Sequence, residues 1–287
     1  MSRDWSGPRR TLGAYTRPVG LVVLKLTITP LVIGGASLVV RRWGPLLGGF
    51  LIALPLTSGP VLFFIALDHG TEFAAGAAKG SLAGCIPIVG FVTAYALVAV
   101  RRPWPVALTA GLVGWALLAL AVQAAPDVAV PVLAGLVVLV VWIALRLLPR
   151  PAVVTVPAVA PSWDVPFRIL VVTGLVVALT AAAQALGPRA SGLLATVPAI
   201  AAALTVFSHQ RDGSSHALGV LRGLLGGLLA TAAFHTVASA ALVPAGIPVA
   251  FITAVGAALA VQGAALLALR RSPLEAVTET ADGLPAL

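Results

Sequence analysis

The chain has 287 residues, of which 60% are hydrophobic and only 9% are charged, and its mean hydropathy is +1.06. This composition excludes a soluble globular domain and predicts an integral membrane protein. The formal net charge of +9 would favour nucleic-acid binding in a soluble protein. Here the arginines lie between apolar runs, so we attribute the charge to the cytoplasmic bias of basic residues and expect no nucleic-acid partner.

The N-terminal tail, residues 1–18, is basic and precedes an apolar run that begins at Val19. A basic segment before an apolar run is also typical of a signal peptide. This run is too long for one, and no cleavage site of small residues follows it. We therefore expect the run to be retained as the first membrane span.

Apolar runs of about 20 residues, each able to cross roughly 30 Å of hydrocarbon as a helix, can be drawn nine times in the chain. Because the runs are continuous and do not alternate with polar residues, they predict helices and not the strands of a barrel. The predicted fold is all-α and polytopic, with spans at 19–40, 46–67, 73–100, 105–125, 127–148, 166–186, 188–208, 216–243 and 247–269.

The second span is interrupted by the stretch ALPLTSGP, which contains Pro55, Thr57 and Ser58. Proline lacks an amide donor and clashes with the preceding turn, so the helix should kink or break there. Backbone freed by a break is tolerated in a membrane where it lines a cavity or is buried in protein, and we predict a solute site at this point. The alternative is a simple kink, in which Thr57 and Ser58 bond the freed carbonyls.

An internal repeat at an offset of 143 residues aligns 44–85 with 187–228 without gaps. Six glycines of the first block fall on glycines of the second, and Pro55 falls on Pro198. Each unit has four spans, and span 127–148 has no counterpart, so five crossings separate each helix from its copy and the second unit is inverted. The predicted organisation is a basic tail (1–18), a first four-helix unit (19–125), a linking helix and proline-rich linker (126–165), an inverted four-helix unit (166–269) and an acidic tail (270–287).

The distribution of arginine is consistent with inversion, since inverted copies exchange their cytoplasmic loops. An N-terminus outside and a C-terminus in the cytoplasm place ten arginines inside and five outside. The basic N-terminal tail argues for the opposite orientation. We expect the first orientation, in the cytoplasmic (inner) membrane of a bacterium.

The order of features in the first unit matches a known pattern. Lys25 precedes the segment GGFLIALPLTSGPVLFFIALDHG, which is followed by EFAAGAAKGSLAGCIPIVGFVTAY and by Trp115 in the fourth span. This order resembles the GlpM-like small inner-membrane proteins, which carry a proline-interrupted second helix, a polar turn and a glycine-bearing third helix with a basic residue near its start. The resemblance covers about residues 20–125 and implies a unit of fold and a membrane location, but no substrate. The second unit departs from it, because AIAAA at 199–203 stands where the first has LTSGP.

Four basic residues form two pairs at the repeat offset. Lys79 and Arg222 lie inside the third and eighth spans, where a charge is a functional hypothesis by default, although long basic side chains also snorkel to the interface. Lys25 and Arg168 begin the first and sixth spans, where they either join a site or anchor at the headgroups. Beside two interrupted helices, four cations favour an anionic solute or a lipid headgroup. The predicted solute-binding residues are Lys79, Arg222, Pro55, Thr57, Ser58, Pro198, Lys25 and Arg168.

Glycine stripes accompany the first of these pairs and predict close helix packing. They consist of Gly76, Gly80 and Gly84 in the third span and Gly219, Gly223 and Gly227 in the eighth.

The remaining polar residues show no catalytic pattern. His235, in the middle of the eighth span, either relays a proton or bonds a neighbouring helix. His209, His216 and Asp212 match no zinc spacing, and no serine-histidine-acid order or nucleotide-binding glycine loop is present. Cys85 is expected to be a core residue. We expect no enzyme activity, no catalytic residue, no metal and no cofactor.

These features together predict a transporter that moves a small, anionic solute or a lipid headgroup by alternating access, with its cavity between the second, third, seventh and eighth spans. A channel of the same architecture is one alternative. Another is a non-transporting subunit or scaffold that packs through its glycine-rich helices as a homo- or hetero-oligomer. The expected partners are the lipid bilayer and a small-molecule solute.

Overall fold

The computed structural model describes residues 58–149 and 198–271, with isolated residues in the ranges 27–55 and 170–178, and leaves out the side chains of 268–271. This described part is helical, with no strand, so the all-α prediction is confirmed for it. Its helices are α3 (Ser58–His69), α4 (Thr71–Ala83), α5 (Cys85–Ala99), α6 (Trp104–Ala124), α7 (Val130–Leu147), α10 (Ala199–Asp212) and α11 (Ser214–Arg271).

Four helical segments are long and apolar enough to cross a membrane. They are Thr71–Ala99, Trp104–Ala124, Val130–Leu147 and Ser214–Leu267. The described residues therefore do not support a count of nine spans, and most of the expected spans 19–40 and 166–186 fall outside them. The four segments are compatible with a membrane protein.

Two glycine turns end α3 and α10 with the same geometry. Gly70 has φ 85° and ψ 170°, and Gly213 has φ 85° and ψ 176°. A positive φ strains residues with a Cβ, which explains glycine at both positions. The Gly70 amide donates to the Ala66 carbonyl at 3.1 Å and the Gly213 amide to the His209 carbonyl at 3.1 Å, and the next residue after each glycine begins a helix.

Two further interruptions shape the long segments. α4 and α5 are separated at Gly84, where Pro87 three residues later has no amide to donate to Ala83 and so weakens the helix. α11 bends at Gly246, whose φ of 74° and ψ of 173° divide it into a first limb, 214–245, and a second limb, 247–271. These limbs match the spans predicted at 216–243 and 247–269.

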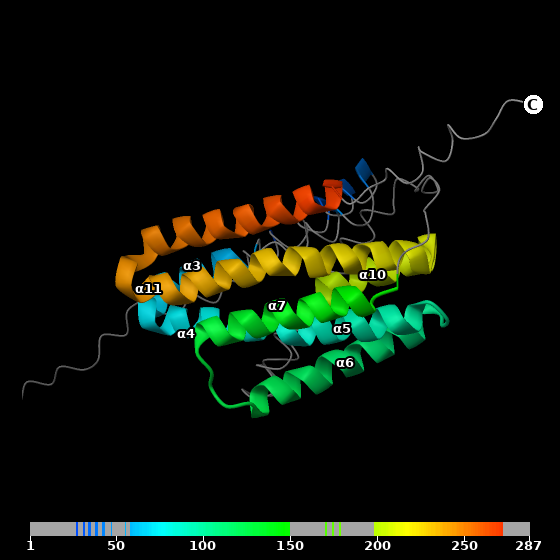
Figure 1. Cartoon of the computed structure of the whole chain (residues 1–287), viewed down its shortest axis with the longest axis horizontal. Helices are drawn as coiled ribbons and strands as arrows, with labels where there is room; N and C mark the ends of the chain where they lie inside the picture. The colour runs from blue at the N-terminus through cyan, green and yellow to red at the C-terminus, as the bar shows by residue number, and fades with distance from the viewer. Residues whose placement is uncertain are drawn as a thin grey trace, which may run out of the picture.

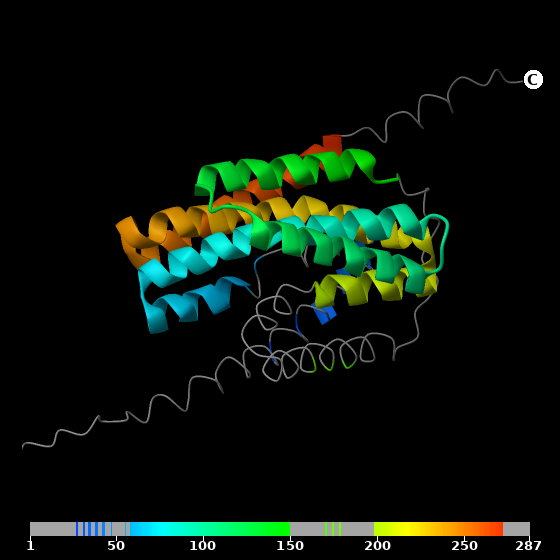
Figure 2. The ribbon, with the colours of Figure 1, turned by 90° about the horizontal axis from the view of Figure 1, so that it is seen from below.

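The segment formed by α4 and α5 lies antiparallel to the first limb of α11. In Figures 1 and 2, α4 and α5 run from left to right while the first limb runs from right to left. The turn at Gly70 lies at the left end of the bundle and the turn at Gly213 at the right end. The Ser239 hydroxyl donates to the Ala75 carbonyl at 3.0 Å, which fixes the register between α4 and this limb.

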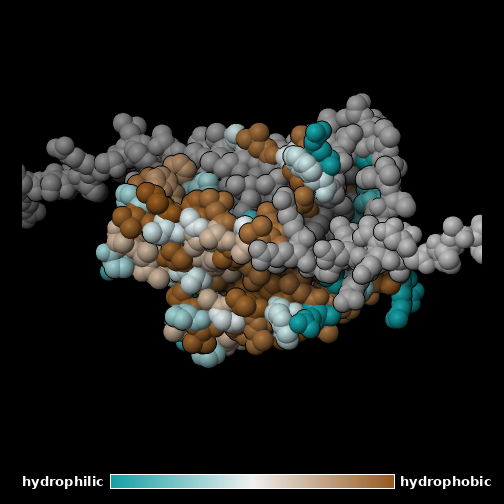
Figure 3. Space-filling model, turned by 45° about the horizontal axis from the view of Figure 1, so that its top comes forward, coloured by the Kyte–Doolittle hydropathy of each residue, from teal (hydrophilic) through white to brown (hydrophobic). Residues whose placement is uncertain are grey.

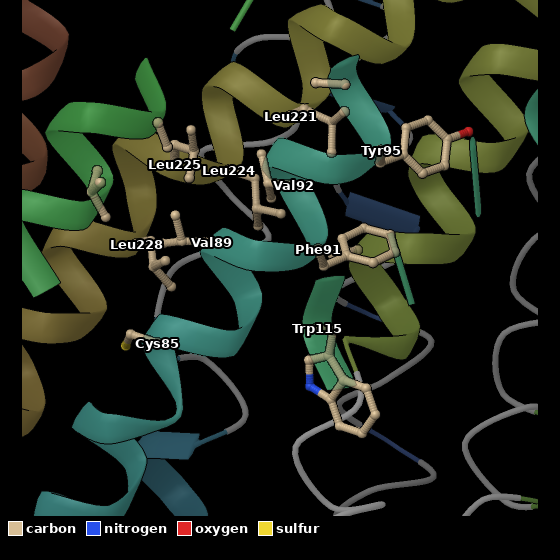
Figure 4. Packing of buried hydrophobic residues seen from close by; sticks show 14 of the residues in the cluster. Cys85, Val89, Phe91, Val92, Tyr95, Trp115, Leu221, Leu224, Leu225 and Leu228 are labelled. Atoms are coloured by element: carbon tan, nitrogen blue, oxygen red, sulfur yellow. The ribbon is translucent and has the colours of Figure 1, made fainter. Parts of the chain in front are cut away.

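The core has two parts that share α11. One part joins the first limb to α5, α6, α7 and α10, and Figure 4 shows Val89 and Val92 of α5 beside Leu221 and Leu225 of α11. The other part joins both limbs to α3 and α4 through small residues, together with Phe234. The first limb of α11 is therefore the central helix of the described bundle.

α5 and α6 cross at close range. A Cβ added to Gly90 would lie 2.6 Å from the Gly114 carbonyl oxygen, and one added to Gly114 would lie 2.7 Å from the Gly90 carbonyl oxygen. A Cβ at Gly111 would lie 2.9 Å from the Phe91 ring. The sequence-based prediction chose the wrong glycines on α4, because Gly76 and Gly80 are exposed and a Cβ there would meet nothing within 4 Å.

The outer surface is apolar, as expected for contact with lipid. Figure 3 shows hydrophobic residues over most of the described surface on that face, with hydrophilic residues in small patches. On α7, for example, the exposed large apolar side chains include Val132, Leu136, Leu139, Trp142 and Ile143. Water would not favour such a surface, so it supports the membrane prediction.

Candidate functional site

Both predicted interruptions coincide with helix starts. α10 begins at Ala199, directly after Pro198, which has the non-helical angles φ −78° and ψ 56°. α3 begins at Ser58, and the Gly59 amide donates to the carbonyl of Pro55 at 2.8 Å. With 12 and 14 residues, the two helices are about 18 and 21 Å long. α10, whose start is marked by the non-helical angles of Pro198, is shorter than the roughly 30 Å of a hydrocarbon core.

The start of α3 faces a buried histidine on α11. His235 Nε2 lies 3.2 Å from the Ser58 hydroxyl oxygen, and His235 is only 1% exposed. Its second ring nitrogen, Nδ1, is buried and has no hydrogen-bond partner among the described residues. Phe234 packs beside the same turn, because a Cβ on Gly59 would lie 3.5 Å from the Phe234 ring. The interhelical hydrogen bond predicted as one role of His235 is therefore present. The Nδ1 atom of the same ring stays unpaired within the described residues.

The ring of His235 can present either a donor or an acceptor at Nδ1. If Ser58 donates to Nε2, then Nδ1 carries the hydrogen and is a donor. If Nε2 donates to Ser58, then Nδ1 is a bare acceptor and the hydroxyl hydrogen is free to donate elsewhere. In either tautomer the pair keeps at least one hydrogen-bonding group, Nδ1, that is not used within the described residues.

Lys79 is paired with an acidic side chain that the sequence analysis did not single out. Its Nζ lies 2.6 Å from Asp127 Oδ1. Asp127 belongs to the loop between α6 and α7, three residues before α7 begins at Val130. The Lys79 side chain is 25% exposed and that of Asp127 is 88% exposed. The pair thus connects α4 to the N-terminal end of α7.

Arg222 binds the opposite end of α7. Its Nη2 donates to the Leu148 carbonyl at 2.7 Å and its Nε to the Pro149 carbonyl at 3.3 Å. These carbonyls lie at the C-terminal end of α7, where a cation complements the partial negative charge of the helix. Because α7 has 18 residues and is about 27 Å long, the structure does not bring Lys79 and Arg222 together.

Three of the predicted solute-binding residues, Lys25, Thr57 and Arg168, lie outside the described residues. The other five are Pro55, Ser58, Lys79, Pro198 and Arg222. Of these, only Pro55 and Ser58 meet at one place, the start of α3.

A second polar side-chain pair joins α5 to α10, and it was not evident from the sequence. The hydroxyl of Tyr95 lies 3.0 Å from His209 Nδ1, and Tyr95 is fully buried. His216 Nδ1 lies 2.8 Å from the Asp212 carbonyl oxygen one turn earlier. Tyr95 had no visible partner in the sequence, because 114 residues separate it from His209.

The ion pair of Lys79 and Asp127 should contribute little to stability, since exposed pairs contribute about 0.5 kcal/mol. We expect Lys79→Asp to lower the free energy of unfolding by about this amount at low salt, and the double variant Lys79→Asp with Asp127→Lys to restore it. Unfolding in mixed detergent micelles measures the difference, which should shrink at high salt because ions screen exposed charges. A loss of similar size in the double variant would contradict the pairing.

No family model, curated protein or solved structure matches this chain. The resemblance of the first unit to the GlpM-like proteins therefore stays a prediction.

Proposed function

We propose that this protein is a membrane transporter, which moves a small polar solute by alternating access between two inverted four-helix units. The observation that carries the proposal is the contact between Ser58, the first residue of the short helix α3, and the buried His235 on the central limb of α11. Buried polar groups inside a membrane bundle are characteristic of solute pathways. Helices that begin within the bundle are characteristic of transporter sites.

The two matching turns support the duplication. Gly70 and Gly213 are 143 residues apart, which is the offset of the sequence repeat, and their backbone angles agree within a few degrees. The hydrogen bonds agree at the same offset: Ala74 donates to Gly70 at 3.2 Å, and Ala217 donates to Gly213 at 3.3 Å. The agreement of turn angles, hydrogen bonds and sequence offset at these two positions supports the proposed duplication.

The opposite directions of the matched segments support the inversion. α4 and α5 run one way through the bundle, and the first limb of α11, their copy in the repeat, runs the other way (Figures 1 and 2). Inverted units suit alternating access, because exchanging the conformations of the two units turns an outward-facing state into an inward-facing one.

The inversion predicts where two loops lie relative to the membrane. Cysteines placed at Glu72 and at Gln210, both exposed, are expected to react with a membrane-impermeant maleimide from opposite faces. The experiment uses a Cys85→Ala background, since Cys85 is the single cysteine of the chain. Labelling of right-side-out and inside-out vesicles provides the comparison. Labelling of both cysteines from the same face would refute the inverted arrangement.

Reconstitution into proteoliposomes tests the function itself. Uptake of a solute above that of empty liposomes, with a rate that saturates as the solute concentration rises, is the expected result. Uptake that does not saturate would indicate a channel. A stable complex with another protein and no uptake would indicate a membrane subunit or scaffold.

A further inference from the structure

The polar contact at the start of α3 is incomplete within the described residues. His235 is 1% exposed, its Nε2 faces Ser58, and its Nδ1 has no hydrogen-bond partner in the part of the chain that the structure describes. Leaving a buried polar atom unpaired costs about 1–3 kcal/mol, and most native proteins avoid it. An unpaired nitrogen beside a helix start therefore points to a group that binds there.

Lys79, the charged residue at the same height in the bundle as His235, is already paired with Asp127. Ser239 of the first limb contacts Ala75 of α4, and these helices are antiparallel. Four residues before Ser239 is His235, and four residues after Ala75 is Lys79. Each step is about 6 Å along the helix axis, so Lys79 and His235 lie at the same height in the bundle. The Lys79 ammonium is held 2.6 Å from the Asp127 carboxylate, so this pair carries no net charge.

The other described elements around His235 add no charge at this level. α3 has no ionisable residue from Ser58 to Leu67, and the second limb of α11 has none from Ile247 to Leu267. Arg222, the copy of Lys79, binds carbonyls at the far end of α7. An ion bound beside His235 would therefore lack a counter-charge among the described residues, and burying an unpaired charge is much more costly than burying a hydrogen-bonded neutral group.

A second neutral group lies on the facing limb. The Gln262 side chain is buried, and its Oε1 has no hydrogen-bond partner within the described ranges. It lies one helical turn beyond Ala258, which belongs to the same buried cluster as Phe234, the neighbour of His235. The neutral imidazole of His235 and the hydroxyl of Ser58 match the hydroxyl or amide groups of an uncharged solute.

We infer that Ser58 and His235 bind an uncharged solute that carries hydroxyl or amide groups. This inference rests on the proposed transport function and names its substrate class. It differs from the anionic solute expected from the matched basic residues. Of these, Lys79 is paired with Asp127 and Arg222 binds the Leu148 and Pro149 carbonyls, and Lys25 and Arg168 lie outside the described residues. The solute would complete the hydrogen bonding of His235 through Nδ1.

Uptake of four radiolabelled probes into proteoliposomes tests the inference: erythritol and mannitol, which are uncharged, and phosphate and succinate, which are anionic. We expect uptake of at least one uncharged probe to exceed that of empty liposomes about tenfold, and uptake of the anions to stay at background. Uptake of an anion alone would overturn the inference but keep the transporter. Uptake of none of the four would overturn both.

Variants locate the site. Ser58→Ala and His235→Asn are expected to reduce uptake of the uncharged probe about tenfold, which corresponds to about 1.4 kcal/mol. Ser81→Ala and His69→Asn are matched controls on exposed positions and should leave uptake unchanged. Size-exclusion profiles and melting temperatures in detergent establish that each variant folds. Folded Ser58→Ala and His235→Asn variants with full uptake would overturn the inference.

Discussion

Replacing Gly114 with alanine is expected to lower the free energy of unfolding by about 3 kcal/mol. The new Cβ would lie 2.7 Å from the Gly90 carbonyl oxygen and 2.8 Å from the Ala94 Cβ. The obstructing oxygen is backbone, so it cannot rotate away as the end of a side chain would, and α5 and α6 must move apart. Gly90→Ala should have a similar effect, because its Cβ would lie 2.6 Å from the Gly114 oxygen.

Gly135 on α7 provides the matched control for this prediction. It is exposed, and a Cβ there would meet nothing within 4 Å. Alanine is the better helix former by up to about 1 kcal/mol, so Gly135→Ala should leave stability unchanged or raise it slightly. Unfolding by sodium dodecyl sulfate in mixed micelles measures all three variants. Equal stabilities for Gly114→Ala and Gly135→Ala would show that the two helices do not cross at this point.

Replacing Arg222 with glutamine is expected to lower the free energy of unfolding by about 2–3 kcal/mol. The guanidinium donates two hydrogen bonds to the Leu148 and Pro149 carbonyls, and bonds from charged donors contribute more than neutral ones. The substitution also removes a cation from the C-terminal end of α7, which contributes about 0.3–1 kcal/mol. The same unfolding assay measures the loss.

Two further variants separate the causes. Arg222→Lys keeps the charge but not the forked donor geometry, so it should recover only part of the stability. Arg101→Gln removes an exposed arginine from the loop between α5 and α6 and should change stability by less than about 0.5 kcal/mol. Equal stability of Arg222→Gln and the unmodified protein would contradict the role assigned to Arg222.

The positions of Lys79 and Arg222 illustrate a consequence of the proposed inversion. Matched residues of inverted units lie toward opposite faces of the membrane, so they approach each other only if both are near the centre. Lys79 and Arg222 are each eight residues from the start of their helices, which is about 12 Å. Lys79 pairs with Asp127 in the loop before α7, and Arg222 binds the Leu148 and Pro149 carbonyls at its other end. The two residues therefore connect opposite ends of α7 to α4 and to the first limb of α11.

The sequence by itself predicted an all-α chain with segments long and apolar enough to cross a membrane, and the described residues agree with both expectations. Among the described residues, α10 begins after Pro198, α11 begins after Gly213, and α11 bends at Gly246, because the conformational limits of proline and glycine are local. The spans expected at 105–125 and 127–148 became α6 and α7 for the same reason, since hydropathy is a property of each segment alone.

Only the tertiary structure decided which polar groups meet. Lys79 pairs with Asp127 and His235 with Ser58, although 177 residues separate the latter two. The crossing at Gly90 and Gly114 was likewise not evident, because many glycines in the chain have similar neighbours. Contacts of this kind depend on how each helix is rotated and how deep it lies against its neighbours, and a hydropathy pattern that is apolar on all sides fixes neither.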